Sequence, residues 1–234
     1  MKLSISMATY RRKDGSTIKY LSRALDSVFN QTHQDFKIYL IGDRYENLEE
    51  INFLLLNYDK DKIYFENLPV AKERDFYTNK NALWSYGGVN AINRSIEVSL
   101  SEGNNYICHL DHDDYWEKNH LENINNCILE TGADWICTKS LYVHNLVYPN
   151  VNGDGKYINF LPKPESLIHS SVCMNFHNIP LLYRDLFDET GIVGLPSDAE
   201  LWKRSSEYIL KNNLKSILIN EITCNHIEEG YERT

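Results

Sequence analysis

The sequence lacks a surplus of positive charge. Its 234 residues carry 24 lysines and arginines against 33 aspartates and glutamates, which gives a formal net charge of -9. The basic residues are scattered, so no basic stripe is present that would displace counterions from a nucleic acid, and no nucleic acid partner is expected. An acidic protein also repels small phosphate-bearing ligands unless a cation or local basic groups intervene. Any phosphate site in this chain therefore favours a metal ion.

Paired cysteines and long apolar runs are absent as well. The five cysteines form no C-x-x-C pair and are too few for a disulfide scaffold in a chain of this length. No stretch approaches the roughly 18 apolar residues that a membrane span needs. The apolar part of residues 1–7 is too short for a signal peptide. We expect a cytoplasmic protein with no transmembrane segment, and peripheral membrane contact stays compatible with this composition.

The common glycine-rich phosphate loops are also missing. Neither G-x-G-x-x-G nor G-x-x-x-x-G-K-[ST] occurs, so the backbone amides of such a loop are not available to hold phosphate. A nucleotidyltransferase is disfavoured for the same reason, because it would be expected to carry a glycine-rich, basic triphosphate loop. A phosphate-binding site in this chain therefore has to use groups other than the backbone amides of such a loop.

Strand and helix patterns alternate up to about residue 140. Strands are predicted at residues 3–7, 36–41, 62–68, 106–110 and 133–138, with helical spacing of apolar residues near 17–29, 48–57, 89–100 and 121–128. Residues 69–88 give no regular pattern. Repeated strand-helix units predict an α/β fold with a mainly parallel central sheet and helices on both faces.

The second part of the chain is less regular. Glycine, proline and asparagine gather between residues 149 and 164, and the clearest later elements are a helix at 198–210 and a strand at 217–222. No linker or internal repeat separates the two parts. We therefore expect one domain over residues 1–234, made of a regular half, 1–140, and a smaller irregular half, 141–234.

Three aspartates directly follow the strand predicted at 106–110. In an extended segment Asp111 and Asp113 project to the same side, and hard cations such as Mg²⁺ and Mn²⁺ prefer carboxylate oxygens. Two carboxylates and a cation make a clamp for a diphosphate. The plainer alternative is an acidic helix start, but one helix cap accounts for one aspartate and leaves two of Asp111, Asp113 and Asp114 unexplained.

The order of these elements resembles the inverting glycosyltransferases of family 2, which have the GT-A fold with a Rossmann-like sheet. The similarity rests on residues 5–12, 27–32, 87–93, 110–114 and 197–202. It implies a hexosyltransferase-like enzyme that moves a sugar, with inversion, from a nucleotide-diphosphate donor to a hydroxyl of a glycan or another acceptor, with a UDP-sugar as the favoured donor. Residues 1–140 would bind the nucleotide-sugar, and residues 141–234 would hold the acceptor and the catalytic base.

The same resemblance implies roles for particular residues. Thr9 and Tyr10 would lie against the nucleoside, Asp43 would accept a hydrogen bond from the base, and Asp111 would approach the ribose. In this DXD pattern Asp113 would bind Mn²⁺ or Mg²⁺, with Asp114 as ligand or support and His226 completing the shell. Asp198 would be the catalytic base. The donor-site set implied is Thr9, Tyr10, Arg12, Asp43, Asn90, Asn93, Asp111 and His112.

Other interpretations stay open at this stage. A metallohydrolase would use His109, Asp111, His112 and Asp113 around a metal pair, whereas the glycosyltransferase interpretation gives His109 a structural role. A third possibility is a nucleotide-sugar-binding module without catalysis. Asp198 has a plainer role as a helix cap, with Glu200 as the reserve base. His169, Ser170, Ser171, Asp188 and Glu189 are candidates for the acceptor side, and one of Trp84, Tyr86, Trp116 and Trp202 is a candidate for stacking on a sugar.

Overall fold

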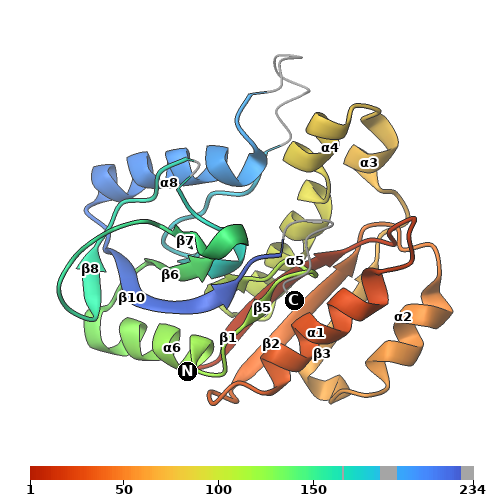
Figure 1. The fold of residues 1–234 in the computed structure, drawn as a ribbon, viewed down its shortest axis with the longest axis horizontal. Helices are drawn as coiled ribbons and strands as arrows, with labels where there is room; N and C mark the ends of the chain where they lie inside the picture. The colour runs from red at the N-terminus through yellow and green to blue at the C-terminus, as the bar shows by residue number, and fades with distance from the viewer. Residues whose placement is uncertain (165, 185–193, 228–234) are drawn as a thin grey trace.

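The computed structural model describes residues 1–164, 166–184 and 194–227, and it places strands from both halves in one sheet (Figure 1). The strand order is β3-β2-β1-β4-β9-β6-β10-β5, with β7 beside β6 and β8 beside β10. The strands are β1 (Leu3–Thr9), β2 (Phe36–Gly42), β3 (Ile63–Asn67), β4 (Tyr106–His109), β5 (Tyr115–Trp116), β6 (Trp135–Leu141), β7 (Val147–Tyr148), β8 (Tyr157–Asn159), β9 (Val172–Asn175) and β10 (Ser216–Asn225).

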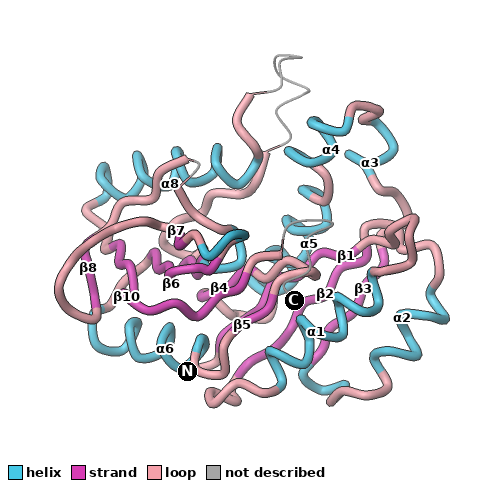
Figure 2. Tube along the Cα trace, viewed as in Figure 1, coloured by secondary structure: helices cyan, strands magenta, loops and turns pink. Residues whose placement is uncertain are grey.

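Helices cover both faces of this sheet (Figure 2). The helices are α1 (Thr17–Phe29), α2 (Leu48–Leu55), α3 (Lys72–Phe76), α4 (Lys80–Tyr86), α5 (Val89–Ser101), α6 (His120–Thr131) and α8 (Ser197–Asn212), with short 3-10 turns η1 (Lys60–Lys62), η2 (Val143–Asn145) and η3 (His169–Ser171). In Figure 1, α8 and α6 lie on either side of β6 and β10.

A hydrophobic core lies on each face of the sheet. On one face, apolar side chains of α1, α2 and α6, among them Leu25 and Ile124, pack against β1 and β2. On the other, α5 and α8 contribute Ile96 and Trp202, which pack with Trp135 of β6. The helical spacing read from the sequence is the spacing that buries one stripe of each helix. The prediction of an α/β fold with a mainly parallel sheet and helices on both faces is confirmed.

The structure contains elements that the sequence pattern did not predict, and two of these differences shape the fold. Strand β9 of the irregular half lies antiparallel between β4 and β6, and so joins the two halves of the sheet. Residues 69–88, predicted to be irregular, form the short helices α3 and α4. Both misses have one cause: a strand of four residues or a helix of five to seven shows too few repeats for its period to be recognised.

The described helices include none with the length and apolar character required to cross a membrane. All five cysteines are buried as free thiols, so no disulfide supports the fold.

An aromatic stack supports the loop that follows β4. Trp116 of β5 stacks on His120 of α6, with ring centroids 4.2 Å apart and an interplanar angle of 13°. The indole Nε1 donates to the Ser170 carbonyl oxygen over 2.7 Å, and His120 Nδ1 lies 2.7 Å from the hydroxyl of Thr223. His120 is fully buried, and burial lowers its pKa to about 3. The folded protein therefore holds this imidazole neutral.

This burial predicts a pH-dependent loss of stability that His120→Phe should reduce. Between pH 6.5 and 3 the unfolded chain binds a proton at His120 that the folded protein does not, so its contribution to stability falls as the pH falls. From pH 7 to 5 the wild type should lose about 2 kcal/mol more than the variant. Urea unfolding of both proteins at the two pH values measures the difference; parallel losses would show that His120 does not titrate in this way.

Candidate active site

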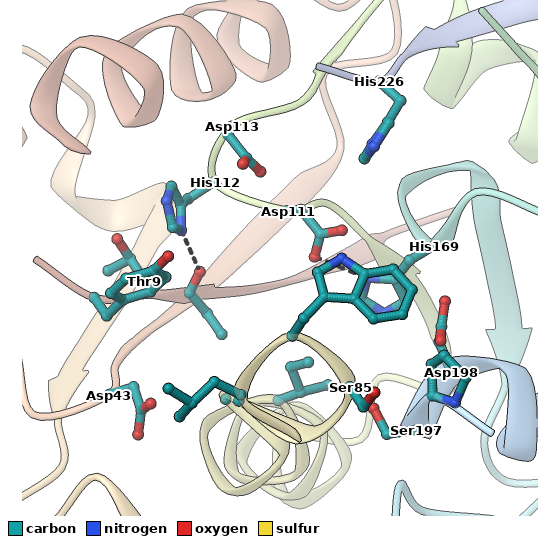
Figure 3. A pocket seen from close by; sticks show the side chains of 18 of the residues that line it. Thr9, Asp43, Ser85, Asp111, His112, Asp113, His169, Ser197, Asp198 and His226 are labelled. Carbon is teal, nitrogen blue, oxygen red and sulfur yellow. Dashed lines mark hydrogen bonds and ion pairs between the residues drawn. The ribbon is translucent and has the colours of Figure 1, made fainter. Parts of the chain in front are cut away.

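A cavity of about 990 Å³ opens where β1, β2 and β4 end. Because the carboxyl ends of parallel strands meet at one edge of the sheet, residues far apart in the sequence meet there. Figure 3 shows Thr9 and Asp43 at one end of this cavity, Asp198 at the other, and Asp111 between them. The lining residues from the predicted set are Thr9, Tyr10, Arg12, Asp43, Asp111, His112, Asp113, Asp198 and His226.

The end of the cavity near β2 combines a carboxylate, a guanidinium and an aromatic ring. Asp43 is buried, and its Oδ2 accepts a hydrogen bond from Arg74 Nε at 2.8 Å. The Arg74 guanidinium lies over the Tyr10 ring, 3.2 Å from its centroid. Burial raises the pKa of Asp43, and the charge of Arg74 opposes that shift. No sequence pattern pointed to Arg74, because this residue lies in the segment predicted to be irregular.

Some residues that line the cavity carry buried polar atoms with no hydrogen-bond partner within the described residues, among them Thr9 Oγ1, Asp43 Oδ1 and His112 Nε2. The other ring nitrogen of His112 lies 3.3 Å from the Ala8 carbonyl oxygen. Burial lowers the pKa of His112 to about 4, so the ring is neutral. With its Nδ1–H donating to Ala8, Nε2 is left as an acceptor. Buried polar atoms without partners are costly, and a polar ligand in the cavity would satisfy them.

The loop after β4 carries the acidic cluster. The Asp113 carboxylate lies 2.6 Å from the Arg12 guanidinium, and its backbone carbonyl oxygen accepts a hydrogen bond from Arg23. Burial, together with the charges of Asp114 and Asp111, raises the pKa of Asp113 to about 7, although Arg12 opposes the shift. Like charges are thus crowded at this point, and a further cation would relieve the crowding.

Asp114 does not line the cavity but braces the loop from within. It is fully buried, and it accepts hydrogen bonds from the Ser170 hydroxyl at 2.5 Å and from the Ile227 backbone N–H at 2.9 Å. His226 Nδ1 lies 3.0 Å from the same carboxylate. Burial would lower the pKa of His226, but the charge and hydrogen bond of Asp114 outweigh it and raise that pKa to about 9.

Asp198 lies on the cavity wall in the first turn of α8. The cap position of this helix is Pro196, so Asp198 does not act as the N-cap, and its Oδ1 accepts a hydrogen bond from the next backbone N–H at 2.7 Å. Burial raises the pKa of Asp198, and the positive charge of His169 opposes the shift. Glu200, the reserve base, is paired with Arg204 at 2.6 Å.

The two asparagines implied by the resemblance lie outside the cavity lining. Asn90 donates its backbone N–H to Glu73 Oε1 at 3.1 Å. The Asn93 side chain bonds both the backbone N–H and the carbonyl oxygen of Tyr183, at 3.0 and 2.9 Å. The cavity lining also includes residues that were not in the donor-site, metal or base set, among them Arg74, Trp84, His169 and Tyr183. Asp188 and Glu189 fall outside the described residues.

The arrangement does not support the metallohydrolase interpretation. The His109 ring is buried and stacks on His169, with centroids 4.7 Å apart, whereas His112 packs edge-on against Tyr10. Within residues 1–164, 166–184 and 194–227, no set of three or more His, Cys, Asp or Glu side chains is arranged to hold a metal ion by itself.

Comparison with known proteins gives the family. The chain is 41% identical over 244 aligned residues, 98% of this chain and 95% of the relative, to a protein of Acanthamoeba polyphaga mimivirus named uncharacterized glycosyltransferase R139. This chain belongs to the glycosyltransferases. No protein-family model matches the sequence.

Solved structures share the fold of this chain. A crystal structure of S. aureus TarS residues 1–349 in complex with UDP-GlcNAc superposes with a TM-score of 0.65 at 14% identity, over 99% of this chain and 60% of that one. The UDP complex of the same protein gives a TM-score of 0.63 over 97% of this chain. The glycosyltransferase described here thus spans about 60% of the structures it matches, and at this identity the likeness shows the fold alone.

The different environments of two neighbouring aspartates predict different costs of removal. Asp114→Ala should lower the free energy of unfolding by about 3 kcal/mol, because it leaves a buried N–H, a hydroxyl and a charged histidine without their partner. Asp113→Ala should cost about 1 kcal/mol or less, since it also removes repulsion within the cluster. Chemical denaturation of both variants tests this, and equal losses would contradict the assignment of Asp114 as a brace.

Proposed function

We propose that this glycosyltransferase has the GT-A fold and transfers a sugar, with inversion, from a UDP-sugar to a hydroxyl acceptor. One observation carries the proposal: residues with unpartnered buried polar atoms line one end of a single cavity, and a half-buried carboxylate, Asp198, lines the other end. The first group is suited to a nucleoside and the second to proton transfer, and the acidic loop lies between them.

The chemistry of the β2 end favours uracil as the base. Asp43 Oδ1 is an unpartnered acceptor, which suits a ring N–H such as the N3–H of uracil. Arg74 beside it is a donor suited to a carbonyl oxygen of the same base, and Tyr10 supplies an aromatic face. The UDP and UDP-GlcNAc complexes of S. aureus TarS, which share the fold, support the same choice.

The acidic loop fits a divalent ion, Mn²⁺ or Mg²⁺, on the chemistry of its donors. Asp113 offers a carboxylate on the cavity wall whose pKa is raised to about 7 by burial and by neighbouring acids, and His226 offers an imidazole on the same wall, a donor that suits Mn²⁺ better than Mg²⁺. These residues do not complete a coordination shell, so diphosphate oxygens would supply the remaining ligands. When bound, the ion would stabilise the departing diphosphate as a Lewis acid.

Side chains of the protein supply the remaining chemistry of the transfer. Arg12 contributes positive charge beside the acidic loop, Asp111 presents a carboxylate in the middle of the cavity, and Asp198 accepts the proton of the acceptor hydroxyl. Burial raises the pKa of Asp198 above the ordinary value of an aspartate, which makes this carboxylate a stronger base. Attack by that hydroxyl opposite the departing diphosphate inverts the anomeric carbon.

The role of Asp198 predicts that Asp198→Asn loses transfer but keeps donor binding. The amide fills nearly the same space and cannot accept the proton, so kcat should fall on the order of 10²- to 10⁴-fold while the Kd for UDP changes little. Glu200→Gln, on the same helix and paired with Arg204, is the matched control and should keep most of the activity.

A panel of UDP-sugars and saccharide acceptors with UDP-release detection measures kcat. Full activity in Asp198→Asn would exclude Asp198 as the base, and absence of transfer in every wild-type reaction would favour a binding module.

The Asp43 site predicts selectivity for the base. Thermal-shift titration of wild type with UDP, CDP, GDP and ADP should show the largest stabilisation with UDP, and saturation at 100 times Kd corresponds to about 2.7 kcal/mol. In Asp43→Ala the preference for UDP should shrink, since the acceptor for the base N–H is gone. A stronger response of the wild type to another nucleotide would reject uracil as the base.

A further inference from the structure

His169 has no role in the mechanism above, yet it lies at the centre of the cavity. It belongs to η3, in the half of the chain where the sequence shows little pattern, and its side chain is 11% exposed. Figure 3 shows its ring between the carboxylates of Asp111 and Asp198. A buried imidazole in this place contacts either the substrates or the groups that do.

Both nitrogens of the ring are fixed. Nδ1 lies 2.8 Å from Asp111 Oδ1, and Nε2 lies 2.8 Å from the Tyr183 hydroxyl. One face of the ring stacks on His109, with centroids 4.7 Å apart. Tyr183 is in turn held at its backbone by the side chain of Asn93. The orientation of His169 is therefore set by packing and by hydrogen bonds on both sides.

The contact with Asp111 has a definite direction. A carboxylate only accepts, so His169 Nδ1–H is the donor, and the lowered pKa of Asp111 agrees with this: burial would raise it, but the charge and hydrogen bond of His169 outweigh burial. With Oδ1 bonded to the histidine, Asp111 Oδ2 is left for a ligand, and the side chain is 39% exposed on the cavity wall. The next residue, Ser170, receives the Asp111 backbone N–H at 3.0 Å.

We propose that His169 is a positioning residue for glycosyl transfer, which fixes the Asp111 carboxylate in the orientation that contacts the donor sugar. This inference rests on the proposed function. The sugar is the part of the donor that changes most during transfer, so loss of this contact should affect kcat far more than nucleotide affinity.

The test compares His169→Phe with His169→Gln. Phenylalanine keeps a flat ring against His109 but has no donor for Asp111, whereas glutamine keeps an amide N–H within a similar length. With the best wild-type UDP-sugar, kcat for UDP release should fall on the order of 10- to 100-fold in His169→Phe and recover in part in His169→Gln. The Kd for UDP should stay within about 3-fold. His177→Gln, an exposed histidine of the same half, is the control and should not change kcat.

A double variant separates positioning from general damage. If His169 acts through Asp111, then Asp111→Asn with His169→Phe should be no slower than Asp111→Asn alone. Multiplied losses in the double variant, unchanged kcat in His169→Phe, or equal losses of UDP affinity and kcat would each overturn the inference. Tyr183→Phe, which removes a hydroxyl and little volume, should lower kcat less than His169→Phe and keeps the test decisive if His169→Phe does not fold.

Different results would overturn the proposed function and the positioning role of His169. A wild-type protein that binds no UDP and releases none from UDP-glucose, UDP-galactose or UDP-N-acetylglucosamine would overturn the proposed function and this inference with it. A wild type that releases UDP, beside a His169→Phe variant of the same kcat, would overturn the inference alone.

Discussion

The structure depends on holding three aspartates together at the end of β4 against their mutual repulsion. Each carboxylate has its own basic partner, and each partner comes from a different part of the chain: Arg12 follows β1, His169 lies in η3 and His226 follows β10. Buried like charges are tolerated only when each is paired. The sheet order, which places β1, β4, β9 and β10 in one sheet, brings these partners together.

Because their partners differ, the three aspartates have different roles. Asp114 is enclosed by backbone and side-chain donors and acts on the loop, not on a ligand. Asp113 keeps one arginine as a partner and faces the cavity, so it remains able to meet a cation, and Asp111 keeps one oxygen for the cavity. Thr9 and Asp43, at the end proposed for the nucleoside, and Asp198, the proposed base, lie on opposite sides of Asp111 in Figure 3.

The sequence predicted the parts of this arrangement that leave a local pattern. Thr9, Asp43 and Asp111 each follow a strand with a readable period, so their meeting at one sheet edge followed from the parallel topology. His169 and Arg74 left no such pattern, because η3 and α3 are too short to show a period, and the contact of His169 with Asp111 spans 58 residues. Asn93 was placed by resemblance alone, and in the structure it holds Tyr183 and does not line the cavity.

The most direct test of the account is calorimetric titration of UDP with and without Mn²⁺, on the wild type and on Asp113→Ala. If the acidic loop holds the cation, Mn²⁺ should strengthen UDP binding to the wild type at least 10-fold, a gain of about 1.4 kcal/mol, and the variant should lose this gain. Wild-type binding that is indifferent to Mn²⁺, or an Asp113→Ala variant that keeps the full Mn²⁺ effect, would contradict a cation held by this loop.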